Sequence, residues 1–215
     1  MRYSVYIFDF DLTLADSRPG ILDCFKYAMN MHGVNIPDDY TIERTIGLTI
    51  EDAFESFLGE KNDELILKLS NTYRSRADEV MTPMTSFFDD AIGVLQLLKN
   101  AGVKLGIVST KKAYRIREAF EKENNLAVID KITGFESVSN CKPDPEGLLK
   151  TIDYFSVDKS EVLYIGDSYI DAKTARNAGV DFCGVLTGTT KRDEFEKYPS
   201  VAICENLTEM LKSIF

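Results

Sequence analysis

The sequence predicts an α/β protein whose doubly wound parallel sheet is interrupted after the first strand by a helical insert. Residues 5–8, VYIF, form a short apolar run typical of a strand buried on both faces. From residue 103 onward, short apolar runs alternate with amphipathic helical patterns, as in parallel sheets with right-handed crossovers. Residues 17–84 instead show helical spacing throughout. These three observations predict a Rossmann-like core with an inserted helical domain.

Composition and charge narrow the class of protein. The chain has 215 residues, of which 44% are hydrophobic and 28% charged, so it can bury a stable core without disulfides or a structural metal. Its formal net charge of −10 argues against nucleic acid or an anionic membrane as a partner. Four scattered cysteines without C-x-x-C spacing favour free thiols in a reducing compartment. We find neither a signal peptide nor an apolar stretch of about 18 residues, so we expect a cytoplasmic protein.

The elements of the core follow in order from the apolar patterns. After the strand at 5–8, short apolar runs predict strands over 103–109, 131–135, 162–166, 181–186 and 201–204. Helical spacing predicts the helices between and after them, over 113–123, 145–155, 170–178 and 207–215.

Residues 17–84 break this rhythm. One helix is predicted between Pro19, near its start, and Gly33, just past its end. A second begins directly after Thr49, which suits an N-cap, and a third closes before Pro83. The insert is therefore expected to be a separate small helical module.

Polar side chains follow four of the predicted strands, at the point where each strand ends. They are Asp9 and Asp11, Ser109 and Thr110, Lys142, and Asp167 with Asp171. Because ligands of open parallel sheets bind outside the carboxyl ends of the strands, we expect these side chains to converge. Taken singly, such a residue is more often a helix cap or a turn residue than a ligand, but the ordered set favours a functional site. Aspartates this close together need either solvent or a cation between them.

These residues carry a resemblance to a known family. Asp9-Phe10-Asp11-Leu12-Thr13, Ser109, Lys142 and Gly166-Asp167-Ser168-x-x-Asp171 resemble the four motifs of the haloacid dehalogenase-like superfamily. The resemblance spans the whole chain, and the helical insert occupies that family's usual cap position. ADSRPGI, IGLTIEDAF and KPDP are most similar to the phosphoglycolate phosphatase-like branch. One departure is Leu12, where the family usually has glycine, and it concerns the turn rather than the carboxylates.

The resemblance implies a Mg²⁺-dependent phosphatase that hydrolyses a small phosphate monoester through an aspartyl phosphate. Asp9 is then the nucleophile, and Asp11 the acid that protonates the leaving alcohol and afterwards activates water. Lys142 balances the charge of the nucleophile and the phosphoryl oxygens. Mg²⁺ is expected on Asp9, the backbone carbonyl of Asp11 and Asp167, since this ion prefers oxygen ligands.

The other motif residues have supporting roles in this scheme. Ser109, with the backbone N–H groups of Thr110 and Lys111, is expected to hold the remaining phosphate oxygens at a helix start. Asp171 is expected to orient metal-bound water or the lysine, and Thr13 to stabilise the loop.

The cap is expected to set substrate choice, because the core motifs grip only phosphate and metal. We assign residues 1–16 and 85–215 to the catalytic core and residues 17–84 to a cap that moves as a lid. Arg44 and Thr49 are the candidate contacts with the leaving group of a small phosphorylated metabolite.

Two other functions stay open. A phosphosugar mutase of the same superfamily is less favoured, because the basic groups that its cap typically presents are missing around residues 46–50. A non-enzymatic phospho-acceptor signalling domain also combines acidic residues, Mg²⁺, a hydroxyl and a lysine. Such domains are shorter, however, and leave the insert after the first strand unexplained.

Overall fold

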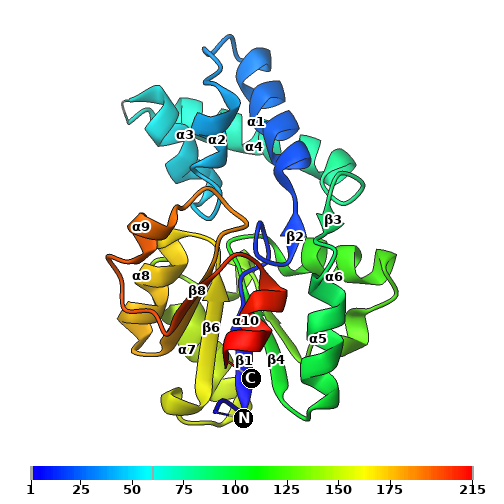
Figure 1. The fold of residues 1–215 in the computed structure, drawn as a ribbon. Coiled ribbons are helices and arrows are strands. Elements are labelled where there is room, and N and C mark those ends of the chain that lie inside the picture. The colour runs from blue at the N-terminus through cyan, green and yellow to red at the C-terminus, as the bar shows by residue number, and fades with distance from the viewer. Residues whose placement is uncertain (1, 60, 215) are drawn as a thin grey trace.

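The computed structural model describes residues 2–59 and 61–214, and its centre is a parallel sheet flanked by helices (Figure 1). Within this described part, six strands lie in the order β5-β4-β1-β6-β7-β8, and all neighbouring pairs are parallel. Their bounds are β1 Val5–Phe8, β4 Lys104–Val108, β5 Lys131–Thr133, β6 Val162–Gly166, β7 Asp181–Val185 and β8 Ala202–Cys204. The predicted doubly wound sheet is confirmed.

Strand β1 is at the centre of the sheet and is buried along its whole length. Its last residue, Phe8, pairs with Ile107 of β4 on one side and with Ile165 of β6 on the other. The chain builds β4 and β5 on one side of β1 before it crosses to β6, so the winding reverses at β1. The residues that follow β1 therefore emerge at the topological switch point, where ligands bind in such sheets.

Helices cover both faces of the sheet and bury its apolar side chains. One face packs against α5 (Ala91–Asn100), α6 (Ala113–Lys122) and α10 (Leu207–Ile214). The other packs against α7 (Glu146–Phe155), α8 (Tyr169–Ala178) and α9 (Arg192–Phe195). Because β1 contributes side chains to both clusters, it must be apolar up to the point where the aspartates begin.

Four helices stand over the carboxyl ends of the strands and form the cap (Figure 1). They are α1 (Arg18–Met31), α2 (Asp39–Glu43), α3 (Ile50–Leu58) and α4 (Asp63–Val80). They have an apolar core of their own, in which the Phe25 ring lies 5.0 Å from that of Phe54 and 4.7 Å from that of Tyr73. Thr49 caps α3, because its side chain accepts a hydrogen bond from the Asp52 N–H. The boundaries of the cap at 17 and 84 stay a prediction.

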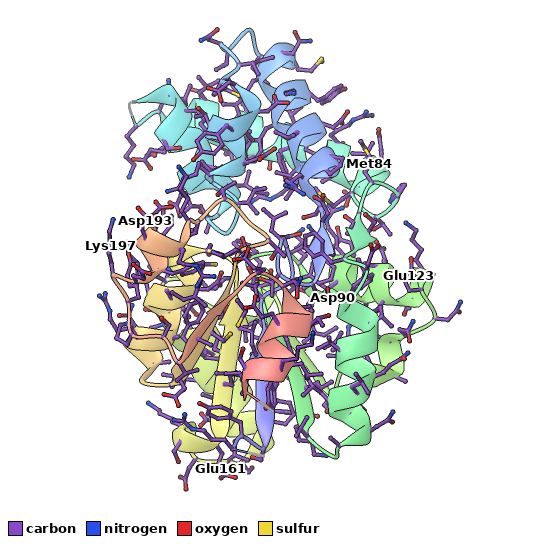
Figure 2. The ribbon with its side chains drawn as sticks, viewed as in Figure 1. Met84, Asp90, Glu123, Glu161, Asp193 and Lys197 are labelled. Carbon is purple, nitrogen blue, oxygen red and sulfur yellow. The ribbon has the colours of Figure 1, made fainter. Side chains whose placement is uncertain are left out.

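The chain enters and leaves the cap through two strands of two residues each, β2 (Ala15–Asp16) and β3 (Ser86–Phe87). They pair antiparallel, with Ala15 opposite Phe87 and Asp16 opposite Ser86. Figure 2 shows Met84 at this junction, between the cap and the sheet. Both connections to the cap therefore run side by side.

Several elements lie outside the sequence predictions. Helix α5 was not predicted, although its buried positions 91, 94, 95 and 98 follow helical spacing. Helices α2 and α9 are too short to show a full helical period, and the same holds for the 3₁₀ turns η1 (Leu126–Val128), η2 (Phe135–Ser137) and η3 (Lys159–Glu161). Phe215, the last residue of the predicted final helix, lies outside the described residues. Across residues 2–59 and 61–214, no helix has both the length and the hydropathy to cross a bilayer.

Candidate active site

Two of the predicted site residues are held by backbone hydrogen bonds that continue the pattern of the sheet past the ends of its strands. The Asp9 N–H donates to the Ile165 carbonyl at 2.8 Å, and the Ser109 N–H donates to the Thr133 carbonyl at 3.1 Å. Each backbone is therefore fixed one residue beyond its strand. Asp9 and Ser109 are both buried at this edge.

A buried lysine lies between two of the aspartates. The Lys142 Nζ is 2.9 Å from Asp9 Oδ2 and 2.7 Å from Asp171 Oδ1, and all three side chains are at most 3% exposed. Burial alone lowers the pKa of Lys142, but the charges of Asp171 and Asp9 more than offset it, so the pKa is raised above its ordinary value. Lys142 therefore stays protonated beside Asp9, as the predicted charge-balancing role requires.

Asp171 is held by four groups, and one of them is a tyrosine. Its Oδ1 accepts from Lys142 and, at 2.8 Å, from the Tyr164 hydroxyl. Its Oδ2 accepts from the backbone N–H and the hydroxyl of Ser168. Burial raises the pKa of Tyr164 well above its ordinary value, so this hydroxyl stays neutral and donates. The contact with Lys142 supports one of the two roles predicted for Asp171, that of orienting the lysine, and this role stays a prediction.

Asp9, Asp167 and Asp171 form a cluster that can hold a metal ion, since one carboxylate oxygen from each lies within 4.8 Å of the others. Asp9 Oδ1 is buried and has no hydrogen-bond partner among the described residues. Such an orphaned oxygen is costly unless a cation binds it. Asp167 Oδ1 accepts from Thr13 at 2.9 Å, which fixes the second carboxylate. The donor set of hard oxygens fits Mg²⁺.

The loop after β7 closes tightly over Asp167. A Cβ added to Gly188 would lie 1.9 Å from Asp167 Oδ2, so this position tolerates only glycine while Asp167 keeps its place. We expect Gly188→Ala to displace the carboxylate and to weaken Mg²⁺ binding at least tenfold in calorimetric titration. Gly93→Ala, in the first turn of α5 with open space around it, is the matched control and should leave Mg²⁺ affinity unchanged. Equal Mg²⁺ affinity in the two variants would remove Asp167 from the metal site.

The buried carboxylates make the metal-free protein sensitive to pH. Burial, opposed by Lys142 and reinforced by Asp171 and Asp11, raises the pKa of Asp9 to about 7. The pKa of Asp167 is also raised, by burial and by its acidic neighbours. Between their unfolded pKa values of about 4 and the raised ones, the native state binds more protons, so its stability falls as pH rises.

We therefore expect the melting temperature in chelator to fall from about pH 5 to about pH 8. Added Mg²⁺ should raise it more at the higher pH, because the metal binds the charged forms. Thermal denaturation at both pH values, with and without Mg²⁺, measures this. Asp9→Asn should show a shallower decline, and an unchanged slope in that variant would contradict the assignment of the pH dependence to Asp9.

Leu12 occupies a strained turn. Its φ is +61°, in the left-handed region that glycine adopts freely. The turn is held by two hydrogen bonds, from the Leu12 N–H to the Ala15 carbonyl and from the Thr187 hydroxyl to the Leu12 carbonyl. The side chain is only 1% exposed, so apolar burial offsets the backbone cost. The chain thus keeps a glycine-like turn with a leucine.

Asp11 contacts one residue next to the first cap helix and one residue of the loop after β4. Its Oδ1 accepts from the Ser17 hydroxyl at 2.5 Å and from Lys111 Nζ at 2.7 Å. The side chains of Lys111 and Asp11 are 7% and 10% exposed, respectively. Lys111 was predicted to contribute only its backbone N–H. The signal that could have pointed to its side chain is its place two residues after Ser109. The structure adds its side chain to the site as the partner of Asp11.

The phosphate-binding candidates lie in the loop after β4. The Ser109 hydroxyl accepts from the Lys111 N–H at 3.3 Å, which curls the loop. Thr110 and Lys111 line a cavity between this loop and the cap. The loop therefore borders the space beside Asp11.

The two cap candidates are placed differently. Thr49 lines the same cavity, on the cap side. Arg44 instead binds both carboxylate oxygens of Glu194 in α9, at 2.9 and 3.0 Å, and donates to the Thr189 carbonyl. Arg44 thus joins the cap to the core, and the prediction that it contacts substrate requires this ion pair to open.

Known proteins resemble this chain over nearly its full length. The crystal structure of a Bacteroides fragilis protein described as a haloacid dehalogenase-like hydrolase has a TM-score of 0.94 at 42% identity, covering 97% of this chain and 99% of that one. Pyrophosphatase PpaX of Bacillus velezensis is 26% identical over 213 residues, or 98% of this chain and 95% of the relative. A PpaX protein of Clostridium perfringens is 30% identical over 179 residues, or 83% of this chain and 82% of the relative.

A family model for haloacid dehalogenase-like hydrolases matches residues 6–185, which include β1, the cap and the strands up to β7. The chain belongs to the haloacid dehalogenase-like hydrolase family. The predicted family resemblance is confirmed.

Proposed function

We propose that this chain is a Mg²⁺-dependent phosphatase that hydrolyses a small phosphate monoester through an aspartyl phosphate on Asp9. The observation that carries the proposal is the buried, unpartnered Oδ1 of Asp9 beside the protonated Lys142. A carboxylate prepared in this way is a nucleophile whose other oxygen is already neutralised. When bound, Mg²⁺ supplies positive charge to the phosphoryl group and aligns it for attack.

The first half of the reaction transfers the phosphoryl group to the protein. An Asp9 oxygen attacks phosphorus, the bond from phosphorus to the leaving oxygen breaks, and Asp11 gives its proton to that oxygen. Lys142 stabilises the charge that develops on the phosphoryl oxygens. The Ser17 hydroxyl and Lys111 contact Asp11 Oδ1, and the proposed transfer requires Asp11 to hold a proton beside Lys111.

The second half regenerates the protein. Asp11, now a carboxylate, takes a proton from water, and the resulting nucleophile attacks phosphorus. The bond between Asp9 and phosphorus breaks, inorganic phosphate leaves, and the protonated Asp11 is ready for the next cycle. Cap closure over the site excludes bulk water during transfer. This is consistent with the position of the cap over the carboxyl ends of the strands (Figure 1).

We expect the purified chain to release phosphate from p-nitrophenyl phosphate repeatedly with Mg²⁺ and to lose this activity in chelator. Phosphate release per chain, followed over time, is the measurement. Full activity in chelator would contradict the metal assignment. A single phosphorylation without turnover would instead favour the phospho-acceptor signalling domain. With a sugar phosphate as the substrate, isomerisation without net phosphate release would favour the mutase.

Inorganic pyrophosphate belongs in the same assay as a second candidate substrate. The relatives named as PpaX pyrophosphatases match up to 98% of this chain, which favours it. The same residues can serve this reaction, with phosphate in place of an alcohol as the leaving group. The ratio of kcat/KM for pyrophosphate and for alkyl phosphates decides between the two substrates.

A further inference from the structure

A cavity lies between the cap and the core, directly beside the proposed general acid. It contains about 740 Å³ of empty space, a figure that includes its opening to solvent. Asp11, Thr110 and Lys111 line its core side. If Asp11 protonates the leaving oxygen, the rest of the leaving group extends into this cavity.

The walls of the cavity are mainly apolar. Six of the side chains that form them are Ile21, Phe25, Ile46, Leu48, Met81 and Phe135. Phe25 and Met81 belong to the apolar core of the cap, so this part of the wall is rigidly packed. Such a surface binds an apolar group by removing both from water.

Three of the four cations that line the cavity are paired with carboxylates. Lys111 pairs with Asp11 at 2.7 Å, and Arg74 pairs with Glu51 at 2.5 Å. Arg115 pairs with Asp78 and also donates to the Ala77 carbonyl. A leaving group with a second negative charge would compete with these carboxylates for Arg74, Lys111 and Arg115.

Lys112 is the remaining cation on the lining, and its Nζ lies 5.8 Å from the centre of the Tyr114 ring. It is thus the residue through which an anionic leaving group would be recognised. A substrate selected for charge would depend on Lys112, and a substrate selected for apolar surface would depend on the wall.

We infer that the cavity takes the uncharged, apolar body of an alcohol leaving group, so the preferred substrates are alkyl or arylalkyl phosphate monoesters. This inference rests on the proposed phosphatase function and adds the chemical class of the substrate. Apolar burial supplies the discrimination, at about threefold to fourfold in affinity per methylene that enters the cavity.

The test is a series of primary n-alkyl phosphates from ethyl to hexyl, with phosphoglycolate and pyrophosphate as anionic comparisons. In this series the reacting group is constant, so kcat/KM for phosphate release reports the binding of the apolar body. We expect kcat/KM to rise with chain length and hexyl phosphate to exceed phosphoglycolate at least tenfold. A flat series, or the highest value on either anionic substrate, overturns the inference. If none of the esters releases phosphate, the proposed function itself has failed.

Wall variants make the test specific to the cavity. Leu48→Asn should flatten the dependence of kcat/KM on chain length. Leu67→Asn is the matched control, because Leu67 is 57% exposed on α4 and should change neither slope nor rate. Lys112→Ala should leave the alkyl series unchanged. A tenfold loss with Lys112→Ala on the best substrate would show recognition by charge and overturn the inference.

Discussion

Asp9→Asn is expected to reduce phosphate release roughly 10⁴-fold or more, as the loss of a covalent nucleophile does in other enzymes. An amide is a poor nucleophile, and no phosphorylated protein should accumulate. Steady-state turnover, together with mass spectrometry of the acid-quenched protein, measures both effects. Near-normal turnover in this variant would show that the nucleophile is misassigned.

The same substitution should not unfold the protein. Burial is the main cause that raises the pKa of Asp9 to about 7, so its charge destabilises the metal-free native state at higher pH. Asparagine removes that charge while keeping the shape of the side chain. In chelator at about pH 8, we expect the variant to melt at the wild-type temperature or above it. Loss of activity without loss of stability separates a chemical role from a structural one.

Asp11→Asn provides the contrast to Asp9→Asn. It should lose turnover but keep Asp9 as a nucleophile, so a substrate with a good leaving group can still phosphorylate the protein. Trapped phosphoprotein in Asp11→Asn and none in Asp9→Asn is the expected pair of results. The reverse pattern would exchange the two roles.

Lys142→Met is the second variant with a large expected effect. We expect it to reduce both the activity and the stability of the protein. Lys142 is the cation between Asp9 and Asp171, and its removal leaves two buried carboxylates without a counter-charge. Breaking a buried ion pair in this way costs about 3–5 kcal/mol of the free energy of unfolding. Chemical denaturation in chelator measures the loss, and kcat should fall at least 100-fold.

Two further variants test the origin of that loss. Lys150→Met removes an exposed lysine that pairs with Glu146 along α7, and a surface pair of this kind contributes only about 0.3–0.5 kcal/mol. The double variant Asp9→Asn/Lys142→Met should recover part of the lost stability, because one of the two stranded charges is gone. Strict additivity in this double-mutant cycle would show that the two side chains do not interact.

The sequence predicted the strands and the order of the motif residues because both are local properties. An apolar run such as 5–8 followed by Asp9 marks a strand end without knowledge of its neighbours. Helix α5 carried a similar local signal, because its buried positions follow helical spacing. The assignments of catalytic, metal-binding and cap residues stay predictions until variants test them.

Other features of the site depend on contacts between distant segments and have no local signature. The ion pair of Lys111 with Asp11 joins two residues 100 positions apart, and that of Arg44 with Glu194 joins residues 150 positions apart. In the sequence, Tyr164 looks like an ordinary core residue of a buried strand. Only the folded structure shows that its hydroxyl donates to Asp171. Gly188 has no motif around it, and only the packing of its loop on Asp167 shows why it is glycine.

The antiparallel pairing of β2 with β3 has a consequence for protein engineering. Because Asp16 lies opposite Ser86, the segment between them departs from and returns to adjacent points of the core. It can be treated as an exchangeable cassette, since the entropy of closing an insertion grows only slowly with its length. A different helical segment, or a short turn, can span the same two points without changing the order of the strands. New ester specificities can then be sought by grafting while the proposed phosphoryl-transfer residues are left in place.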